Sequence, residues 1–143
     1  MKVDKVLEVK GQDINRIAPD QPVSEALGLL EEYRIGALVV SDNDDTPAGI
    51  LSERDIVRAL PGLREKIFST PVRDLMSTPV TTCNLDDTVA HVMTVMTEER
   101  RRHLPVMDNG KMCGLISIGD VVRCRVEELR DETETLRDYI GAR

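Results

Sequence analysis

Two stretches of the chain carry nearly the same residues: GILSERDIVR at positions 49–58 and GLISIGDVVR at positions 114–123. The offset between them is 65 residues, and Gly, Ser, Asp, Val and Arg recur at identical places. Three further places exchange only Ile, Leu and Val. Self-similarity at such a spacing is the signature of a duplicated structural unit. We therefore predict two copies of one fold in tandem.

The repeat extends upstream of these stretches. PVSEA at 22–26 aligns with TVAHV at 88–92, and LVVSD at 38–42 aligns with LPVMD at 104–108, both at an offset of 66 residues. The difference of one residue falls in the polar loop that follows each of the latter segments. A change of loop length there costs little, so the duplication covers most of the chain.

Both copies predict the same order of secondary structure. Apolar residues at three- and four-residue spacing predict a helix in each copy, and short apolar runs around a polar turn predict two strands and a second helix. In the first copy we expect a leading strand near 14–18, a helix near 23–30, strands at 37–41 and 48–51, and a second helix at 53–60. In the second copy we expect a leading strand near 79–83, a helix near 89–96, strands at 103–107 and 113–116, and a second helix from 118 onward. Pro61, Gly62, Thr70 and Pro71 mark a linker between the copies, with a short helix around 63–68. Each copy is thus a β-α-β-β-α unit, and two such small units should pack together in one α/β (α+β) fold.

Composition narrows the possible partners. The 143 residues include 26 acidic and 19 basic side chains, a net charge of −7, with one Phe, two Tyr and no Trp. The core must therefore be aliphatic. Nucleic acids select basic surfaces and stacking aromatic rings, so we expect no nucleic-acid partner.

No sequence signal places the chain in a membrane or outside the cell. The longest apolar run, at 36–40, falls far short of the ~20 residues that span a bilayer. The first residues alternate charged and apolar side chains, unlike a secretory signal, so we expect a cytoplasmic protein. Cys83, Cys113 and Cys124 are odd in number and widely spaced, which predicts small apolar core residues rather than a disulfide framework or a metal site.

Catalytic motifs are missing from the sequence. It contains no GxxxxGK[ST] loop and no HExxH element. His91 lies on an expected helix, and His103 has no Cys or Ser nucleophile motif near it. We therefore expect a binding protein rather than an enzyme.

The repeated Ser and Asp residues each follow a strand and open a helix. One interpretation is a helix cap, in which Ser52 or Ser117 accepts from a backbone amide and Asp55 or Asp120 reaches back to the preceding turn. The other is a nucleotide site, because a helix N-terminus binds phosphate and a carboxylate accepts hydrogen bonds from ribose hydroxyls. The two interpretations are compatible.

Both repeats resemble CBS domains, and the pair resembles a Bateman module, similar to small stand-alone bacterial proteins and to the γ subunit of AMP-activated kinase. The resemblance rests on the strand HLPV at 103–106 and on the twice-repeated Gly-apolar-apolar-Ser-x-x-Asp segment. It implies a disc-like module with pseudo-twofold symmetry, strands at the centre and helices outside. We assign an N-terminal helix and linker to 1–11, repeats to 12–61 and 76–126, a linker to 62–75 and a C-terminal helix extension to 127–143.

The resemblance also implies an adenosine-containing ligand and no required cofactor. AMP or ADP is favoured, while ATP, NAD and S-adenosylmethionine stay open. Implied ribose ligands are Asp120 and Asp55, and implied phosphate ligands are Ser117, Ser52, Arg102, His103 and Arg54. Gly36 and Ala37 stand in the first copy where Arg102 and His103 stand in the second, so the two sites differ. We expect the Asp120 site to be occupied more readily.

Adenine in such modules lies partly against the backbone that precedes the first strand of the opposite repeat. For the Asp120 site this implies Lys10, Gly11, Asp13 and Asn15, with Ile35 and Leu115. For the Asp55 site it implies Met76, Ser77, Pro79 and Thr81, with Ile50. In the second set Arg101 replaces an apolar residue, which weakens the expected packing of adenine there.

The C-terminal segment predicts an assembly. Apolar residues recur at heptad spacing, interrupted only by Thr133: Val122, Val126, Leu129, Thr133, Leu136 and Ile140. We expect a homodimer in which this helix packs on the other subunit, the alternative being a helix that folds back along its own module. An unidentified protein target is also implied. Two other functions stay open: a constitutive interaction scaffold with a vestigial ligand site, or a regulatory module that acts in trans.

Overall fold

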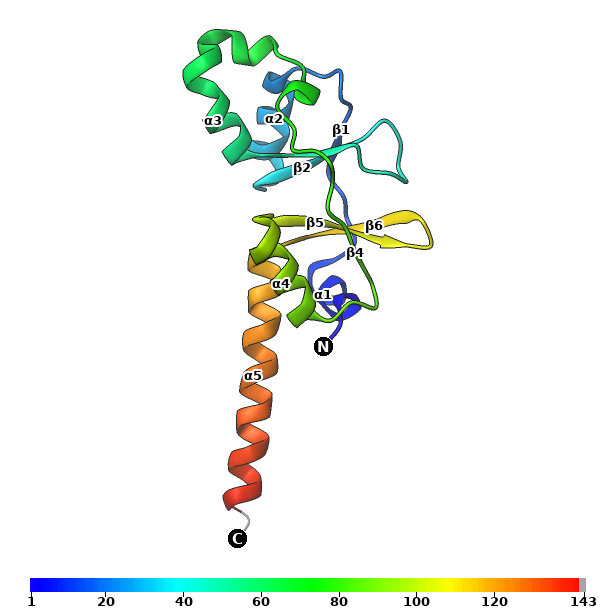
Figure 1. The fold of residues 1–143 in the computed structure, drawn as a ribbon, viewed down its shortest axis with the longest axis vertical. Helices are drawn as coiled ribbons and strands as arrows, with labels where there is room; N and C mark the ends of the chain where they lie inside the picture. Colours follow the sequence, from blue (N-terminus) through cyan, green and yellow to red (C-terminus); the bar gives the residue numbers. More distant parts are fainter. Residues whose placement is uncertain (142–143) are drawn as a thin grey trace.

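The computed structural model describes residues 1–141 and consists of two three-stranded sheets, with helices on their outer sides (Figure 1). The first repeat contains β1 (Arg16–Ile17), α2 (Val23–Tyr33), β2 (Ala37–Val40), β3 (Gly49–Ser52) and α3 (Glu53–Leu63). The second contains β4 (Cys83–Asn84), α4 (Val89–Glu99), β5 (His103–Asp108), β6 (Lys111–Ser117) and α5 (Ile118–Gly141). Helix α1 (Val3–Lys10) precedes the first repeat, and two 3₁₀ helices, η1 (Arg64–Ser69) and η2 (Val72–Asp74), join the repeats.

The two sheets have the same topology. In each, the leading strand pairs in parallel with the central strand, and the central strand pairs antiparallel with the third. Val39 lies opposite Ile50 in the first sheet, and Pro105 lies opposite Leu115 in the second. The predicted pair of β-α-β-β-α units is confirmed.

The sheets pack face to face at the centre of the molecule. Figure 1 places β2 and β5 next to each other, with α2 and α3 beyond one sheet and α1, α4 and α5 beyond the other. The residues buried between the sheets are Ala37, Val39, Ile50, Met112 and Leu115, with Ile14, Val80 and Met107 at their edge. This central cluster is aliphatic, as the composition requires.

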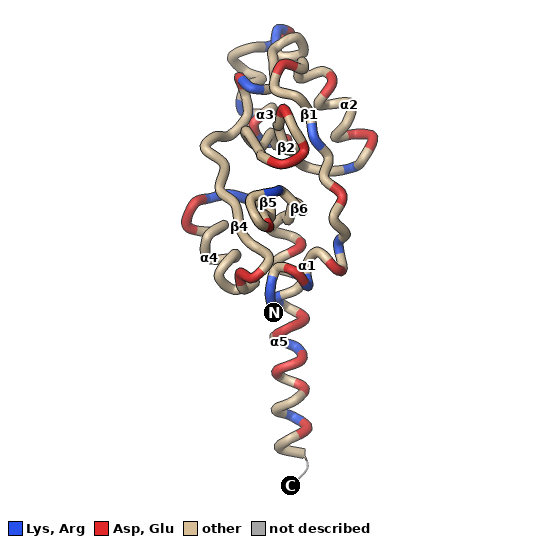
Figure 2. Tube along the Cα trace, turned by 90° about the vertical axis from the view of Figure 1, so that its right-hand side faces the viewer, with Lys and Arg blue, Asp and Glu red and all other residues tan. Residues whose placement is uncertain are grey.

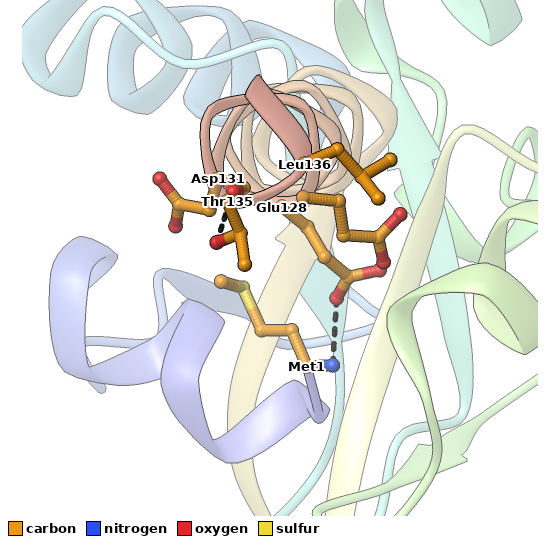
Figure 3. A pocket seen from close by; sticks show the side chains of 6 residues that line it. Met1, Glu128, Asp131, Thr135 and Leu136 are labelled. Carbon is orange, nitrogen blue, oxygen red and sulfur yellow. Dashed lines mark hydrogen bonds and ion pairs between the residues drawn. The ribbon is translucent and has the colours of Figure 1, made fainter. Parts of the chain in front are cut away.

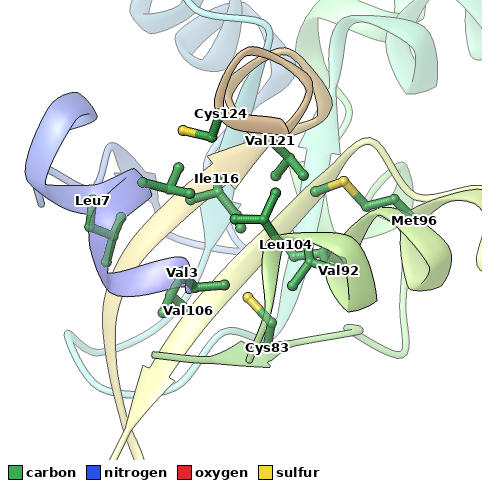
Figure 4. Close-up of a cluster of buried hydrophobic side chains, with 12 residues drawn as sticks. Val3, Leu7, Cys83, Val92, Met96, Leu104, Val106, Ile116, Val121 and Cys124 are labelled. Carbon is green, nitrogen blue, oxygen red and sulfur yellow. The ribbon is translucent and has the colours of Figure 1, made fainter. Parts of the chain in front are cut away.

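Helix α1 covers the sheet of the second repeat, although it precedes the first repeat in the chain. The Val3 amide donates to the carbonyl of Asp87 at 2.9 Å, and Val3 and Leu7 on α1 are buried in the core of the second repeat (Figure 4). The linker helices instead close the first repeat, where the Val72 amide donates to the Gln21 carbonyl at 2.9 Å. The segments before β1 and before β4 therefore cross between the repeats.

Two glycines allow these crossing segments to approach the sheets. Gly49 on β3 lies against Met76, and Gly114 on β6 lies against Leu7. A Cβ atom at Gly114 would lie 2.7 Å from Leu7 Cδ2, a distance that real Cβ contacts do not show. The glycine that begins the repeated segments 49–58 and 114–123 thus allows close packing in both copies.

Element boundaries differ from the sequence expectations in three places. Helix α3 continues through Pro61 and Gly62 to Leu63, because a proline in the last turn removes only one helical hydrogen bond. The short linker helix expected around 63–68 lies at 64–69 and is a 3₁₀ helix. Each leading strand has only two paired residues, and β4 begins at Cys83 rather than near position 79.

Helix α5 extends well beyond the rest of the molecule (Figure 1). Its 24 residues include charged side chains along the whole length, with both signs visible in Figure 2. Within residues 1–141, no helix combines the length and the apolar character needed to cross a bilayer.

Two glycine substitutions should have opposite effects on stability. Gly114→Ala should lower the free energy of unfolding by about 1–3 kcal/mol, because Leu7 is buried and cannot yield to the added methyl group. Gly28→Ala should raise it by about 0.5–1 kcal/mol, since Gly28 lies inside α2 with no atom within 4 Å of the added Cβ. Urea denaturation of both variants checks this, and a Gly114→Ala variant as stable as the parent would contradict the close approach of α1.

Candidate functional site

Helices α3 and α5 begin with the same hydrogen-bonded box. In α3 the Asp55 amide donates to Ser52 Oγ at 3.2 Å, while Asp55 Oδ2 accepts from the Ser52 amide at 2.8 Å. In α5 the Asp120 amide donates to Ser117 Oγ at 3.2 Å, while Asp120 Oδ2 accepts from the Ser117 amide at 2.9 Å. The predicted helix caps are confirmed, and each fixes a carboxylate at a helix N-terminus.

Asp120 has a cationic partner from the far end of the chain. Lys10 Nζ lies 2.7 Å from Asp120 Oδ2 and also donates to the carbonyl of Leu115. The side chains are 32% and 15% exposed, so the pair is partly shielded from water. Burial favours a raised pKa for Asp120, but hydrogen bonds from Lys10 and Ser117 outweigh it and hold the pKa below its ordinary value of 3.8. Asp120 is therefore an ionised acceptor at neutral pH.

The second oxygen of Asp120 remains available. The hydrogen bonds to Asp120 from the Ser117 amide, Ser117 Oγ and Lys10 Nζ all end on Oδ2. Within residues 1–141, no group donates to Asp120 Oδ1. A ligand hydroxyl can use this oxygen without breaking the helix cap.

Asp55 is held differently. Its Oδ1 accepts from Ser77 Oγ at 3.1 Å, and Ser77 is fixed by two backbone hydrogen bonds to Ile50, at 2.8 and 3.2 Å. No ion pair involves Asp55 in the described part of the chain. Asp55 also lines a pocket of about 460 Å³ between α3 and the linker, with Arg58, Ala59, Leu63, Thr70, Asp74 and Leu75. Both oxygens of Asp55 are thus engaged, unlike those of Asp120.

The basic run before β5 lies beside the start of α5. The Ile118 amide donates to the Arg102 carbonyl at 2.8 Å, just as the Glu53 amide donates to the Gly36 carbonyl at 3.0 Å in the first repeat. Figure 2 shows the basic residues gathered between α4 and β5. The pseudo-symmetry therefore places Arg102 and His103 near one helix N-terminus and two small neutral residues near the other.

His103 reaches across the interface between the repeats. A Cβ atom at Gly36 would lie 3.9 Å from His103 Nε2. Burial, followed by the charge of Lys10, lowers the pKa of His103 below 6.5, and the nearby carboxylates of Asp120 and Asp55 oppose this shift. The imidazole is therefore neutral at pH 7 and lies within electrostatic range of both carboxylates.

The other predicted site residues are only partly brought together. Leu115 and Lys10 lie at Asp120, and Ile50 and Ser77 lie at Asp55, as expected. Pro79 and Thr81 instead contact the end of α4, through Arg101 and Glu99. Within residues 1–141, no hydrogen bond or ion pair joins the remaining predicted residues to either carboxylate. Gly11 ends α1 with a φ of 97°, and the Asn15 carbonyl accepts from the Val39 amide. Ile35 and Met76 pack on the core of the first repeat, and Asp13 and Arg54 are exposed.

A larger pocket lies elsewhere, between the chain start and α5 (Figure 3). Its volume is about 620 Å³, and three acidic residues line it: Glu128, Asp131 and Glu132. Glu128 is paired with the amino group of Met1 at 2.6 Å. An acidic lining repels phosphate, so this pocket does not fit a nucleotide.

The family comparison agrees with this geometry. The family model for the CBS domain matches residues 8–62 and 72–127. The chain belongs to the CBS-domain family. The two matched segments coincide with the two sheets and their helices, and they leave the distal part of α5 outside the match.

Two relatives and one more distant structure show the extent of the similarity. The mitochondrial CBS domain-containing protein CBSX3 of Arabidopsis thaliana is 37% identical over 125 residues, which span 85% of this chain and 61% of that protein. The crystal structure of the CBS-domain protein ATU1752 from Agrobacterium tumefaciens has a TM-score of 0.83 at 40% identity, covering 87% of this chain and 99% of that one. The CBS domain pair of MJ0100, solved in complex with 5-methylthioadenosine and S-adenosyl-L-methionine, has a TM-score of 0.77 at 22% identity, covering 90% and 98%, and shows the shared fold.

The Lys10–Asp120 pair should give stability that depends on pH. Because the pKa of Asp120 is lowered by folding, its contribution is present above pH 3.8 and is lost as pH falls through the folded pKa. Lys10→Met should therefore lower the free energy of unfolding at pH 7 by about 1–2 kcal/mol, and this loss should shrink below pH 3.8.

The matched control is Lys5→Met, which removes an exposed pair with Glu8 on the same helix. It should change stability by less than about 0.5 kcal/mol at any pH. Thermal denaturation across pH compares the two variants. Equal effects, or a Lys10→Met loss that does not depend on pH, would contradict the ion pair.

Proposed function

We propose that this chain is a regulatory module that binds an adenosine-containing ligand between its two CBS repeats, with AMP or ADP as the favoured ligand. The observation that carries the proposal is the capped N-terminus of α5, where Asp120 keeps Oδ1 available and Lys10, Arg102 and His103 lie close by. The positive end of a helix dipole, a carboxylate and two cationic side chains match a phosphate and a ribose on one small molecule.

Each part of the ligand has a partner of fitting chemistry. The ribose hydroxyls donate to Asp120 Oδ1, and the phosphate lies at the positive end of the α5 dipole, next to Arg102. Lys10 exchanges Asp120 for the phosphate, since its ammonium group already lies at this carboxylate. A bound phosphate favours protonated His103, so binding takes up a proton as the pKa of the imidazole rises.

The positive charges of Lys10 and Arg102 near Asp120 distinguish among adenosine compounds. S-adenosyl-L-methionine and 5-methylthioadenosine, found with the CBS pair of MJ0100, support an adenosine ligand in this fold. S-adenosylmethionine carries no phosphate and has a cationic sulfonium, which Lys10 and Arg102 repel. These residues therefore favour AMP, ADP or ATP over S-adenosylmethionine.

The Asp120 site is proposed to fill before the Asp55 site. Ser77 already occupies Asp55 Oδ1, and Gly36 and Ala37 supply no charge for a phosphate. A ligand at Asp55 must displace Ser77 and holds fewer charge-assisted hydrogen bonds.

The regulatory output is proposed to pass through α5. Asp120 lies on the first turn of this helix, whose far end leaves the module (Figure 1). A ligand shifts the module only by its different affinity for two states, and a change at the start of α5 alters the position of its whole length. We place this regulation in the cytoplasm, in a homodimer that acts on another protein.

A panel of ligands tests the proposal. Thermal-shift measurements compare AMP, ADP, ATP, NAD, S-adenosylmethionine and adenosine. AMP or ADP should stabilise the chain most at equal concentration, by about 2.7 kcal/mol for a ligand present at 100 times its Kd. By calorimetry, Asp120→Ala should weaken AMP or ADP binding by roughly tenfold or more, because one or two charge-assisted hydrogen bonds are lost.

Asp131→Ala, an acid on the exposed part of the same helix, should bind like the parent. No stabilisation by any ligand would favour the alternative of a scaffold with a vestigial site. Binding that survives Asp120→Ala and fails in Asp55→Ala would reverse the assignment of the two sites.

A further inference from the structure

Helix α5 carries an apolar seam that its own module does not cover. The helix packs on the module through Val121 and Cys124, which are buried. The seam lies on another side of the helix, roughly 120° away at 100° per residue. Val122, Leu129 and Leu136 on this seam are 40%, 44% and 62% exposed. The alternative that the helix folds back along its own module is therefore wrong.

The residue types along the seam are typical of a two-stranded coiled coil. With Val122 at a heptad d position, the d residues are Val122, Leu129 and Leu136, and the a residues are Val126, Thr133 and Ile140. Every a residue is β-branched, and two of the three d residues are Leu. In parallel coiled coils this combination favours two strands over three or four.

The charges beside the seam favour the parallel orientation. Arg130 and Arg137 lie at e positions, and Glu132 lies at a g position. In a parallel pair, Glu132 faces Arg137 of the second copy, and symmetry forms this ion pair twice. In an antiparallel pair, Glu132 faces Glu132 and Arg130 faces Arg130, which is repulsive. Arg125, the other charged g residue, is already paired with Glu128 on its own helix.

The first turn of α5 is already formed by the module, before a partner helix binds. An isolated helix is costly to start in water, because its first turn fixes several residues for a single hydrogen bond. Here the first turn is built by the cap of Ser117 and Asp120 and by the module beneath it. The seam continues through residues 128–141, beyond the segment that matches the CBS family, so the fold of the repeats alone does not account for it.

We infer that α5 forms a parallel two-stranded coiled coil with the α5 of a second copy of this chain, along the seam from Val122 to Ile140. The second copy presents the same seam and the complementary ion pair, which an arbitrary apolar partner does not. The two modules then lie at the same end of the coiled coil, and in each copy Asp120 lies on the first turn of α5. This inference concerns assembly and stands whether or not a nucleotide binds.

Light scattering on the full chain tests the partner. The parent should have twice the 16.0 kDa mass of one chain, and the double variant Leu129→Asp/Leu136→Asp should be a monomer. Both leucines are exposed, so the module should stay folded, which circular dichroism checks. The control Thr135→Asp adds one negative charge next to the seam residue Leu136, without removing a seam side chain, and should remain a dimer.

Two further variants test the orientation. Glu132→Arg should raise the dimer dissociation constant roughly tenfold, and adding Arg137→Glu should restore it, because the ion pairs then form with exchanged signs. Ile140→Cys should cross-link the dimer under mild oxidation, since equivalent a residues meet only in the parallel arrangement. The parent, which keeps Cys83, Cys113 and Cys124, is the background control for cross-linking.

The outcomes separate the possibilities. A monomeric parent, or a trimer or tetramer, would overturn the inference, as would a dimer that survives Leu129→Asp/Leu136→Asp. A dimer that does not cross-link through Ile140→Cys would refute the parallel orientation. Loss of nucleotide binding with an intact dimer would count against the proposed function alone.

Discussion

The apolar contact between the two sheets determines the rest of the structure. Ala37, Val39 and Ile50 of the first repeat pack on Met112 and Leu115 of the second. Neither small sheet has a second face covered without this contact, and burial of aliphatic surface is the main stabilising term available to a chain with three aromatic residues. The contact also brings His103 opposite Gly36 and sets the N-termini of α3 and α5 on either side of one interface.

The two segments that cross between the repeats bring different side chains to the two carboxylates. Because α1 covers the second repeat, its last residue, Lys10, ends beside Asp120 rather than near its own repeat. The linker covers the first repeat and brings Ser77 to Asp55 in the same way. The two pseudo-equivalent carboxylates thus receive an ammonium group in one case and a hydroxyl in the other. The duplication gives both repeats the same backbone fold and the same Ser–Asp cap. The crossing segments give the two sites different side chains.

The sequence predicted the features that depend on local pattern. The duplicated stretch predicted the sheets, the helix order and both Ser–Asp caps, because capping and strand alternation involve residues close in the chain. The family resemblance placed Lys10 at the Asp120 site, but the ion pair between them was not predicted, because it joins residues 110 positions apart through packing of α1 that no periodicity reports. Nor did the sequence predict that Gly49 and Gly114 allow the close approach of Met76 and Leu7. The seam on α5 was visible in the sequence, but only the structure shows that the module leaves it uncovered.

We propose that both repeats contribute to one ligand site, with elements from each touching the same molecule. An NMR titration of the ¹⁵N-labelled chain with AMP tests this most directly, because backbone amides report contact residue by residue. We expect shifted amides at 10–15, at 101–103 and at 117–121, since the first segment is far in sequence from the other two and all three are proposed to meet at Asp120. Shifts confined to one repeat, or gathered at the acidic pocket around Glu128, would contradict it.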